Sequence, residues 1–496
     1  MISFLRKAHQ QHTILGEIYA LLEWDQETNL LENGMPARTN QLAFLAKSMH
    51  KELTNATYTK KLSKHIDLVT GEVCNADYTF IEKAALREAR REWLLATKLP
   101  ASFVAEFTET TGHAMQVWNK AKTNRDFSLF AKPLNQVITL SRKKADFLGY
   151  TDHPYDALLD LYEPSFLSNA LQALFKDLKS SLIPLIQTCV KAPRIALSSS
   201  LPFCLEKQKQ VGQELLHLLT LSTTRLDISS HPFCTRIHPD DLRMTTRLDP
   251  LNLWSNFFSV LHEGGHALYH RNLPKQFYGT PLCDATSYAV DESQSRFFET
   301  ILGKSLPFID YITPKLHELF PKQLSSYSSE DLYRLINQVE ATPIRIEADE
   351  VTYNLHIILR FELEQALLEG SLSVEEIPDA WNQKMKDYLG IIPKHDGEGC
   401  LQDIHWAMGG MGYFPSYTLG NLIAAQFFQT MQGELPDWHQ QIRTGQFQPI
   451  IQWLSNNIHS HGKIYSTEDL IRKVTHNPLN SSNYMHYLET KFHKLS

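Results

Sequence analysis

The chain of 496 residues has the composition of an ordinary globular protein, with 43% hydrophobic and 21% charged residues. Its formal net charge of -7 gives no basic field for nucleic acid or an anionic membrane, and no stretch approaches the roughly 20 apolar residues that span a bilayer, so neither partner is expected. The N-terminus lacks a signal-peptide core and the six cysteines form no Cys-x-x-Cys pair, which predicts a cytoplasmic protein with reduced thiols and argues against a thiolate zinc site.

Helical periodicity dominates the chain. Apolar residues at three- and four-residue spacing predict helices over 80–97 and 353–369. Strand-like alternation is confined to short stretches near 227–236 and 241–247, which we expect to form a small sheet beside the helix that follows. The sequence therefore predicts a mainly α-helical protein with one small β element.

The best candidate for a boundary between two parts of the chain is a stretch rich in Ser and Pro at 190–206. Neither an internal repeat nor a low-complexity tract accompanies it. We expect a helical N-terminal half, about residues 1–200, that leads into a catalytic half, 201–496. The two halves are expected to pack as a single unit over 1–496.

Residues 261–270 contain the pattern His-Glu-x-x-His. His262 and His266 stand four residues apart, so on a helix both imidazoles project from one face and can reach one metal ion. Glu263 lies near the same face, where it can hold a metal-bound water and take its proton. The pattern therefore predicts two metal ligands and a general base.

The surroundings of this motif indicate a helix that is largely buried. The preceding residues 254–261 are mostly apolar. Gly264 and Gly265 each cost about 1 kcal/mol relative to Ala in a helix interior. Such a cost is explained if larger side chains would obstruct a substrate or a packed neighbour.

A water-activating zinc needs a third protein ligand, usually a carboxylate from a following helix. The segment 288–299 supplies the candidates. Glu292 is the predicted ligand and Glu299 the alternative. Asp291 is expected to orient a ligand histidine without touching the metal.

Peptide hydrolysis creates an oxyanion that needs a hydrogen-bond donor across from the metal. The Gly-rich stretch 399–417 carries three side chains that can donate: His405, Tyr413 and Tyr417. We interpret these residues as candidate catalytic contacts, against the alternative that the tyrosines belong to the core.

An enzyme that removes C-terminal residues must also recognise a free carboxylate, and Arg does so with a bidentate fork. Arg345 and Arg243 are the candidates. The alternative for each is a structural ion pair with the neighbouring acids, and the sequence does not separate the two.

With these residues in view, the chain resembles the carboxypeptidase Taq family of metallocarboxypeptidases. The resemblance covers essentially the whole chain and includes the segments 24–28, 96–100 and 154–164. Six family motifs occur in order: His-Pro-Phe at 231–233, Asp-x-Arg-x-Thr at 241–245, His-Glu-x-x-His at 262–266, the element at 291–294, the element at 344–349 and Gly-x-x-Gln-Asp-x-His-Trp at 399–406.

The resemblance implies a saddle-like helical body with a deep groove, assembled as a homodimer. It implies stepwise release of C-terminal amino acids from peptides with a free C-terminus, with broad side-chain tolerance. The implied cofactor is one Zn²⁺ ion per chain, for which Co²⁺ can substitute because ligand geometry sets the selectivity.

The family's functional residues carry over onto matching positions. By this resemblance the metal ligands are His262, His266 and Glu292, and Glu263 is the general base. The implied contact for the substrate carboxylate is Arg345, and Arg243 and His231 are further candidate substrate contacts. A looser similarity to other helical His-Glu-x-x-His peptidases implies His405, Tyr413 and Tyr417 as contacts of the substrate or of the oxyanion.

The chain departs from the family at one position of these motifs. Asp291 stands where the family usually has His before the ligand Glu. We expect the added negative charge to strengthen the electrostatic hold on the metal and to alter the pH dependence. The comparison of pH–rate profiles between the parent and Asp291→His tests this expectation.

Two other functions remain open from sequence. A His-Glu-x-x-His oligopeptidase would cut internal bonds and would tolerate the loss of Arg345. A pseudoenzyme would bind peptides without cleaving them, although binding alone does not require the base Glu263.

Overall fold

Helices form most of the computed structural model, which describes residues 1–197 and 201–495. Residues 198–200, inside the predicted boundary at 190–206, lie outside the described residues. The predicted fold class is confirmed, because the helices are accompanied by a small three-stranded sheet. In the described part of the chain, no helix is both long enough and apolar enough to cross a membrane.

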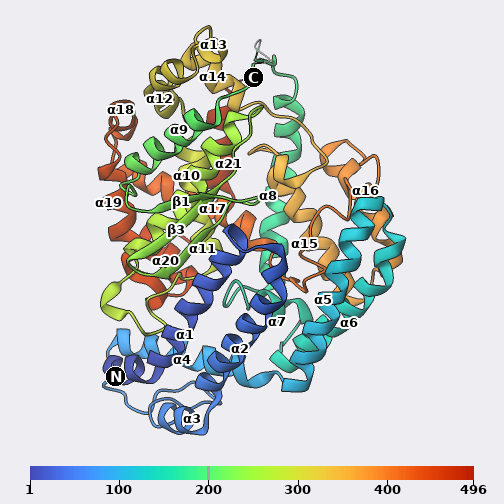
Figure 1. The fold of residues 1–496 in the computed structure, drawn as a ribbon, viewed down its shortest axis with the longest axis vertical. Coiled ribbons are helices and arrows are strands. Elements are labelled where there is room, and N and C mark those ends of the chain that lie inside the picture. Colours follow the sequence, from blue (N-terminus) through green and yellow to red (C-terminus); the bar gives the residue numbers. More distant parts are fainter. Residues whose placement is uncertain (198–200, 496) are drawn as a thin grey trace.

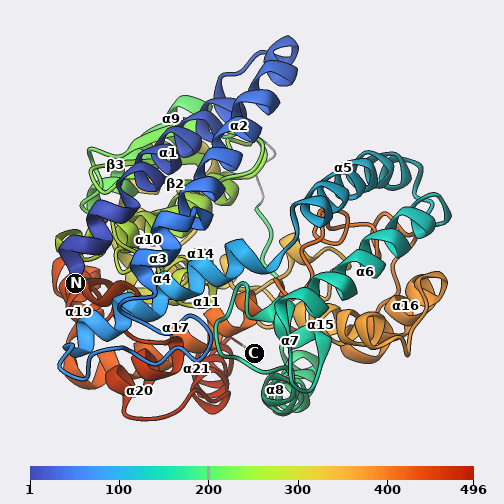
Figure 2. The same cartoon turned by 90° about the horizontal axis from the view of Figure 1, so that it is seen from below.

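The N-terminal helices begin with an antiparallel arm. Its two helices lie side by side and project away from the body of the molecule (Figure 2). Helix α4 matches the helix predicted at 80–97, and its first turn is closed by a capping box between Thr79 and Glu82. The bounds are α1 (Ile2–Thr28), α2 (Met35–Thr54), α3 (Ala56–Leu62) and α4 (Phe80–Lys98).

A second group of helices forms a lobe on the opposite side from the arm, at the right in Figure 2. Helix α15 matches the helix predicted at 353–369. The members of this lobe are α5 (Ala101–Asn124), α6 (Ser128–Leu148), α7 (Pro154–Leu159), α8 (Ser168–Cys189), α15 (Tyr353–Glu369) and α16 (Ile377–Leu389).

The sheet has the strand order β1 (Arg225–Ile228), β3 (Asp241–Thr246), β2 (Cys234–His238). Strand β1 pairs parallel to β3, and β2 pairs antiparallel to it with an irregularity at Arg236/His238. The strand-like stretch predicted near 227–236 contributes to two strands, because it is divided between β1 and β2. The interruption contains Pro232, which has no backbone N–H to donate to a ladder.

The centre of the molecule is built by α10 (Leu253–Asn272), α11 (Tyr288–Arg296), a π-helical turn η3 (Phe297–Leu302) and α17 (Pro415–Glu434). Strand β3 packs on α10, and Figure 1 shows the sheet beside α10 and α11. Two glycines allow the close approach. A Cβ on Gly265 would lie 2.4 Å from the Gln294 carbonyl oxygen, and one on Gly420 would lie 2.6 Å from Glu292 Cγ.

The remaining helices surround this centre. A cluster of buried hydrophobic residues runs from α5 to the end of the chain, and a smaller one lies beneath the N-terminal helices. The bounds are α9 (Leu205–Leu218), α12 (Leu306–Leu319), α13 (Pro321–Leu324), α14 (Ser329–Ile336), α18 (Trp438–Arg443), α19 (Gln448–Asn457), α20 (Thr467–Thr475) and α21 (Ser482–Phe492). Short 3-10 turns lie at η1 (Glu32–Gly34), η2 (Lys275–Phe277), η4 (Arg345–Glu347), η5 (Val374–Glu376) and η6 (His459–Ile464).

Candidate active site

Helix α10 carries the His-Glu-x-x-His residues. The Asn252 side chain caps its start by accepting a hydrogen bond from the Trp254 backbone N–H at 3.1 Å. Core residues such as Phe257 are fully buried. The side chains of His262 and His266 keep 25% and 17% of their surface exposed. The two imidazoles therefore face an accessible site while the rest of the helix packs in the core.

Three predicted ligands meet at one point. Glu292 Oε2 lies 3.8 Å from His262 Nε2 and 3.6 Å from His266 Nε2, and all three donor atoms lie within 4.8 Å of one another. Two ligands that each stand about 2.1 Å from a tetrahedral zinc are about 3.4 Å apart. The donor set therefore fits a divalent ion that prefers nitrogen and carboxylate ligands.

Behind His262 stands Glu299, the alternative third ligand. Its Oε2 bonds to His262 Nδ1 at 2.8 Å and accepts a hydrogen bond from Arg296 Nη1 at 2.7 Å. Glu299 thus occupies the side of the ring opposite to the Nε2 donor. When the Nδ1–H bonds to a carboxylate, Nε2 is left with a lone pair for a metal.

His266 has an equivalent support. Its Nδ1 bonds to Asp291 Oδ1 at 2.7 Å, and the other oxygen of Asp291 lies 3.0 Å from His270 Nε2. This contact fits the orienting role predicted for Asp291. Sequence reasoning missed His270 and Arg296, although His270 continues the four-residue spacing of the motif histidines.

The two supporting carboxylates are held ionised. Burial alone would raise the pKa of Asp291, but the charges of His270 and His266 and their hydrogen bonds lower it well below its ordinary value. Burial likewise opposes ionisation of Glu299, while the Arg296 charge and the His262 hydrogen bond lower its pKa. Each ligand imidazole is therefore backed by a negative charge.

Glu263, the predicted base, is 6% exposed. Burial raises its pKa, as do the nearby charges of Glu292 and Asp291, while His262 and His266 act in the opposite direction. A carboxylate with a raised pKa is a stronger base near neutral pH.

The predicted oxyanion stretch, 399–417, runs from the long connection between α16 and α17 into the first turn of α17, where Tyr417 lies. Glu364 of α15, itself fully buried, accepts hydrogen bonds from Trp406 Nε1 at 2.8 Å and from the Gly412 backbone N–H at 3.1 Å. It also accepts one from the Tyr155 hydroxyl at 2.9 Å. One buried carboxylate thus ties the connection to two helices of the second lobe.

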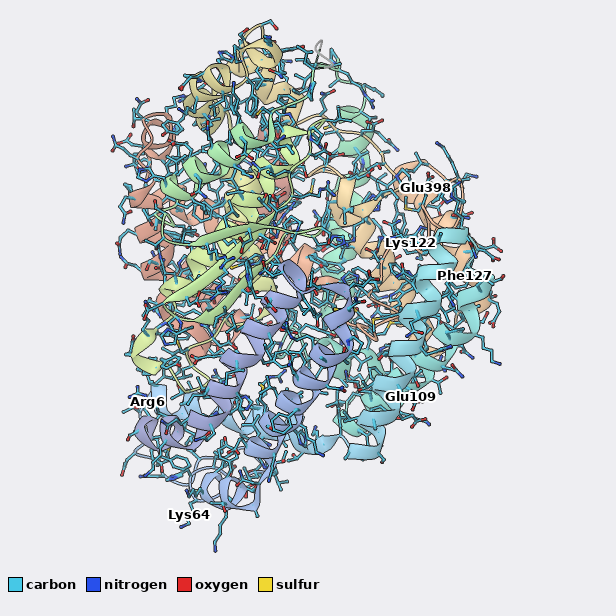
Figure 3. The ribbon with its side chains drawn as sticks, viewed as in Figure 1. Arg6, Lys64, Glu109, Lys122, Phe127 and Glu398 are labelled. Atoms are coloured by element: carbon cyan, nitrogen blue, oxygen red, sulfur yellow. The ribbon has the colours of Figure 1, made fainter. Side chains whose placement is uncertain are left out.

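Further anchors come from α5 and the start of α6. Lys122 Nζ donates to the Gln402 carbonyl at 2.9 Å, and the Phe127 backbone N–H donates to Asp396 Oδ2 at 3.0 Å. Figure 3 labels Lys122 and Phe127 near Glu398, on the right of the molecule. The connection is therefore held at several points along its length.

Arg345 lies inside this framework and is 7% exposed. Its guanidinium donates to Asp403 Oδ1 at 2.8 and 3.2 Å and to the Tyr353 hydroxyl at 3.0 Å. Asp403 also pairs with Arg360 at 2.6 Å. These bonds use three of the five N–H donors of Arg345, so the ion pair fixes the guanidinium and still leaves donors for a ligand.

The three predicted donors gather around Arg345. The ring of Tyr413 lies 5.5 Å from that of His405 and 5.3 Å from that of Tyr417, and the Arg345 guanidinium carbon is 5.2 Å above the Tyr417 ring. Burial lowers the pKa of His405 to about 4, against the opposing charge of Asp403. His405 is therefore neutral near pH 7 and can donate one N–H.

Arg243 and His231 lie elsewhere, on the sheet and its β1–β2 connection. Arg243 donates to both oxygens of Asp241, at 3.0 and 2.9 Å, and lies 6.0 Å above the Trp24 ring. His231 is exposed. In the structure Arg345 therefore lies beside Tyr417, in the group formed by His405, Tyr413 and Tyr417. Arg243 forms an ion pair with a neighbouring acid, which is the alternative role that the sequence left open for it.

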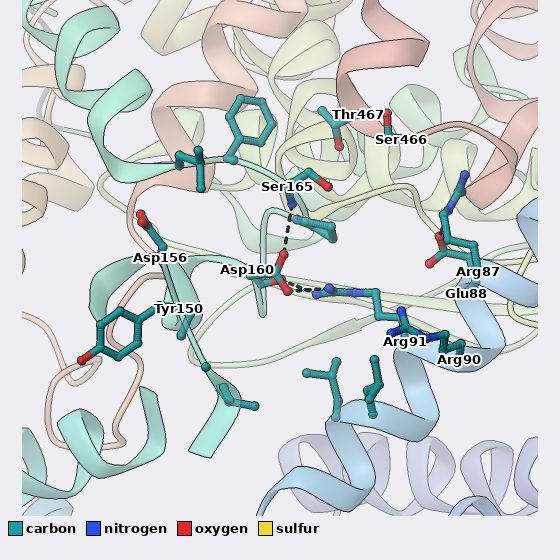
Figure 4. A pocket seen from close by; sticks show the side chains of 18 of the residues that line it. Arg87, Glu88, Arg90, Arg91, Tyr150, Asp156, Asp160, Ser165, Ser466 and Thr467 are labelled. Atoms are coloured by element: carbon teal, nitrogen blue, oxygen red, sulfur yellow. Dashed lines mark hydrogen bonds and ion pairs between the residues drawn. The ribbon is translucent and has the colours of Figure 1, made fainter. Parts of the chain in front are cut away.

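A cavity of about 400 Å³ reaches this site from the side of α4, and its lining includes Asp291, His270 and Tyr288. It shares lining residues with a neighbouring cavity of about 580 Å³. Figure 4 shows this second cavity, where Arg91 pairs with Asp160 at 2.5 Å. On the side of Asp291 and His270, the group of metal-ligand residues therefore borders a cavity that extends to α4.

Fully buried Glu163 supports the start of α11 by accepting a hydrogen bond from the Ala289 backbone N–H at 2.6 Å. Burial raises its pKa from 4.5 to about 7. The folded protein thus holds this proton longer than the unfolded chain, so Glu163 makes stability fall as the pH rises from about 4.5 to about 7, by about 3 kcal/mol. We expect Glu163→Gln to remove this loss of stability between about pH 4.5 and 7, because Gln does not titrate and still offers an oxygen acceptor to the Ala289 backbone N–H.

The measurement is the melting temperature of metal-free parent and variant at pH 5 and pH 8. The difference between the two proteins is expected to move in favour of Glu163→Gln at pH 8. Because other buried carboxylates titrate in both proteins, only this difference reports on Glu163. An equal difference at the two pH values would contradict the assignment.

The chain is similar to known proteins over nearly its whole length. Residues 4–492 match the family model described as carboxypeptidase Taq (M32) metallopeptidase. Carboxypeptidase 1 of Bacillus subtilis is 37% identical, covering 97% of this chain and 95% of the relative, and thermostable carboxypeptidase 1 of Thermus thermophilus is 37% identical, covering 98% and 97%. The structure of a Pyrococcus furiosus carboxypeptidase superposes with a TM-score of 0.95 at 34% identity, covering 99% and 98% of the two chains. This chain belongs to the carboxypeptidase Taq (M32) family of metallopeptidases.

Proposed function

We propose that the protein is a zinc-dependent carboxypeptidase that releases C-terminal amino acids from peptides with broad side-chain tolerance. The observation that carries the proposal is the convergence of His262, His266 and Glu292, with donor atoms within 4.8 Å, beside the buried Glu263. Membership in a metallocarboxypeptidase family supports the direction of cleavage.

When bound by these three ligands, a divalent ion supplies Lewis-acid chemistry and lowers the pKa of water. Glu263 takes the proton of the attacking water and delivers it to the leaving amine. His405, Tyr413 and Tyr417 present donors to the carbonyl oxygen of the scissile bond. Arg345 binds the substrate's terminal carboxylate, with Asp403 fixing the guanidinium in place.

The test compares a peptide with its C-terminally amidated twin, each incubated with the metal-loaded protein and followed by mass spectrometry. A ladder of products from the free peptide alone supports the carboxypeptidase. Equal cleavage of both peptides supports an oligopeptidase, and binding without cleavage supports a pseudoenzyme.

Arg345→Gln is expected to lower kcat/KM for the free peptide by about 100-fold, because a charge-assisted hydrogen-bonded pair is lost. Arg243→Gln serves as the matched control and is expected to leave kcat/KM within about threefold, since Arg243 is committed to Asp241. The reverse ranking would transfer the carboxylate site to Arg243.

The choice of Zn²⁺ over Co²⁺, the homodimer and the cytoplasmic location remain predictions. The nitrogen and carboxylate donor set supports zinc. Metal analysis of the purified protein and its sedimentation velocity test the first two directly.

A further inference from the structure

We propose that His270 is a positioning residue for the metal centre, which holds Asp291 and through it the ring of His266. The proposal rests on the proposed metal site and adds a residue outside the His-Glu-x-x-His motif. It concerns a chain of three side chains, in the order His266, Asp291, His270, that links two turns of α10 through α11.

The geometry of this chain is continuous. Asp291 receives His266 Nδ1 on one oxygen at 2.7 Å and His270 Nε2 on the other at 3.0 Å. A carboxylate bound through one oxygen can rotate about its Cβ–Cγ bond, whereas one bound through both oxygens has a fixed plane. His270 therefore fixes the direction in which Asp291 presents its acceptor to the ligand.

The other ligand histidine offers an internal comparison. His262 is backed by Glu299, and Glu299 is backed by Arg296 at 2.7 Å. Each ligand histidine thus has a carboxylate behind it and a nitrogen donor behind the carboxylate. The parallel shows that His270 stands in the position that Arg296 fills on the other side.

A purely structural role explains His270 poorly. Its Nδ1 is buried and has no hydrogen-bond partner among the described residues. A buried polar atom without a partner costs about 1–3 kcal/mol, which an apolar side chain of similar size would avoid. What an apolar side chain cannot supply is the bond to Asp291.

The departure from the family pattern fits the same assignment. Where the family usually has His, this chain has Asp291, and the carboxylate therefore stands between two imidazoles. Asp291→His would place three imidazoles in a row and remove the carboxylate. Adding His270→Glu would place a carboxylate at the far end, since Glu Oε and His Nε2 stand the same number of bonds from Cβ.

The experiment measures the dissociation constant of Zn²⁺ by competition with a chelating dye. His270→Ala is expected to weaken Zn²⁺ binding by about 10-fold or more, the scale found when a partner of a ligand histidine is removed. His270→Gln is expected to recover most of the loss, because its amide can donate to Asp291. In an Asp291→Asn background, His270→Ala is expected to have little further effect.

The exchange variants provide a second, independent reading. Asp291→His alone is expected to weaken Zn²⁺ binding, and the double variant Asp291→His/His270→Glu to bind more tightly than that single variant. The proposal would be overturned if the double variant bound Zn²⁺ no more tightly than Asp291→His. It would also be overturned if His270→Ala had the same Zn²⁺ dissociation constant as the parent.

His12→Ala serves as the matched control, because His12 is another helix histidine with a protein partner, the Met49 carbonyl at 3.3 Å, and it lies on the N-terminal arm. Its Zn²⁺ constant is expected to equal that of the parent. Circular dichroism of the metal-free variants separates misfolding from loss of affinity. If His270→Ala does not fold, His270→Leu replaces it, because Leu fills more of the space but cannot donate to Asp291.

The two proposals fail in different ways. A parent protein that binds Zn²⁺ but does not shorten peptides contradicts the proposed function. The Zn²⁺ dissociation constants of the parent and its variants still test the role of His270 in that case. An active parent whose constant does not change in His270→Ala contradicts only the role of His270. A parent that binds no Zn²⁺ contradicts both.

Discussion

Glu263→Gln is expected to lower kcat/KM for peptide cleavage by about 1,000-fold while the protein keeps its metal. General-base catalysis contributes about 10²- to 10⁴-fold, and the amide cannot accept the proton that the carboxylate takes. The ligand atoms belong to His262, His266 and Glu292, so the substitution leaves the donor set intact. The measurements are kcat/KM on a free peptide and the Zn²⁺ content of the same sample.

A matched control for this variant is Glu299→Gln. Glu299 lies on the far side of His262 and is expected to affect metal affinity more than turnover at saturating Zn²⁺. Retention of more than about a tenth of the parent kcat/KM in Glu263→Gln, with metal bound, would remove Glu263 from the role of base.

Gly265→Ala is expected to destabilise the protein severely, by more than about 3 kcal/mol, and to release the metal. The added Cβ would lie 2.4 Å from the Gln294 carbonyl oxygen and 2.6 Å from Ser295 Cα. Both contacts are with backbone atoms of α11, so the whole helix would have to move, which exceeds the usual overpacking cost of about 1–3 kcal/mol. Because α11 carries Glu292, the third ligand would move with it.

The neighbouring Gly264 supplies the control. A Cβ there would lie 2.4 Å from Cδ1 of Leu219, the far end of a flexible side chain. Gly264→Ala also gains about 1 kcal/mol of helix propensity, so its stability is expected to stay within about 1 kcal/mol of the parent. The measurements are the thermal unfolding and the Zn²⁺ content of the two variants. Equal losses of stability and of Zn²⁺ in both would contradict the claim that contact between Gly265 and the backbone of α11 sets the difference.

The helical fold class and the shared face of His262 and His266 could be predicted from the sequence because both depend on local spacing. A separation of four positions places His262 and His266 on one face of any helix. The choice of Glu292 over Glu299 depended on how α11 packs on α10. In the structure Glu292 faces both Nε2 atoms, whereas Glu299 bonds to the Nδ1 side of His262.

The substrate contacts were harder to predict because they depend on tertiary structure. Arg345 and Arg243 each have acidic neighbours in sequence, and only the fold shows that Asp403, 58 residues away, pairs with Arg345. Alternation near 227–236 indicated strand structure but did not show the break at Pro232 that divides the stretch between β1 and β2. His270 gave only a spacing signal, since its function depends on the contact between α10 and α11.

The anchoring of the α16–α17 connection has a thermodynamic consequence for a bound peptide. Glu364, Arg360 and Lys122 hold residues of this segment before any substrate arrives. Because this connection is already ordered, it loses little conformational freedom when a peptide binds. The entropic cost of association therefore comes mainly from the ordering of the peptide itself. Short or stiff peptides should therefore associate with a smaller entropy penalty than long flexible ones that present the same terminal residue.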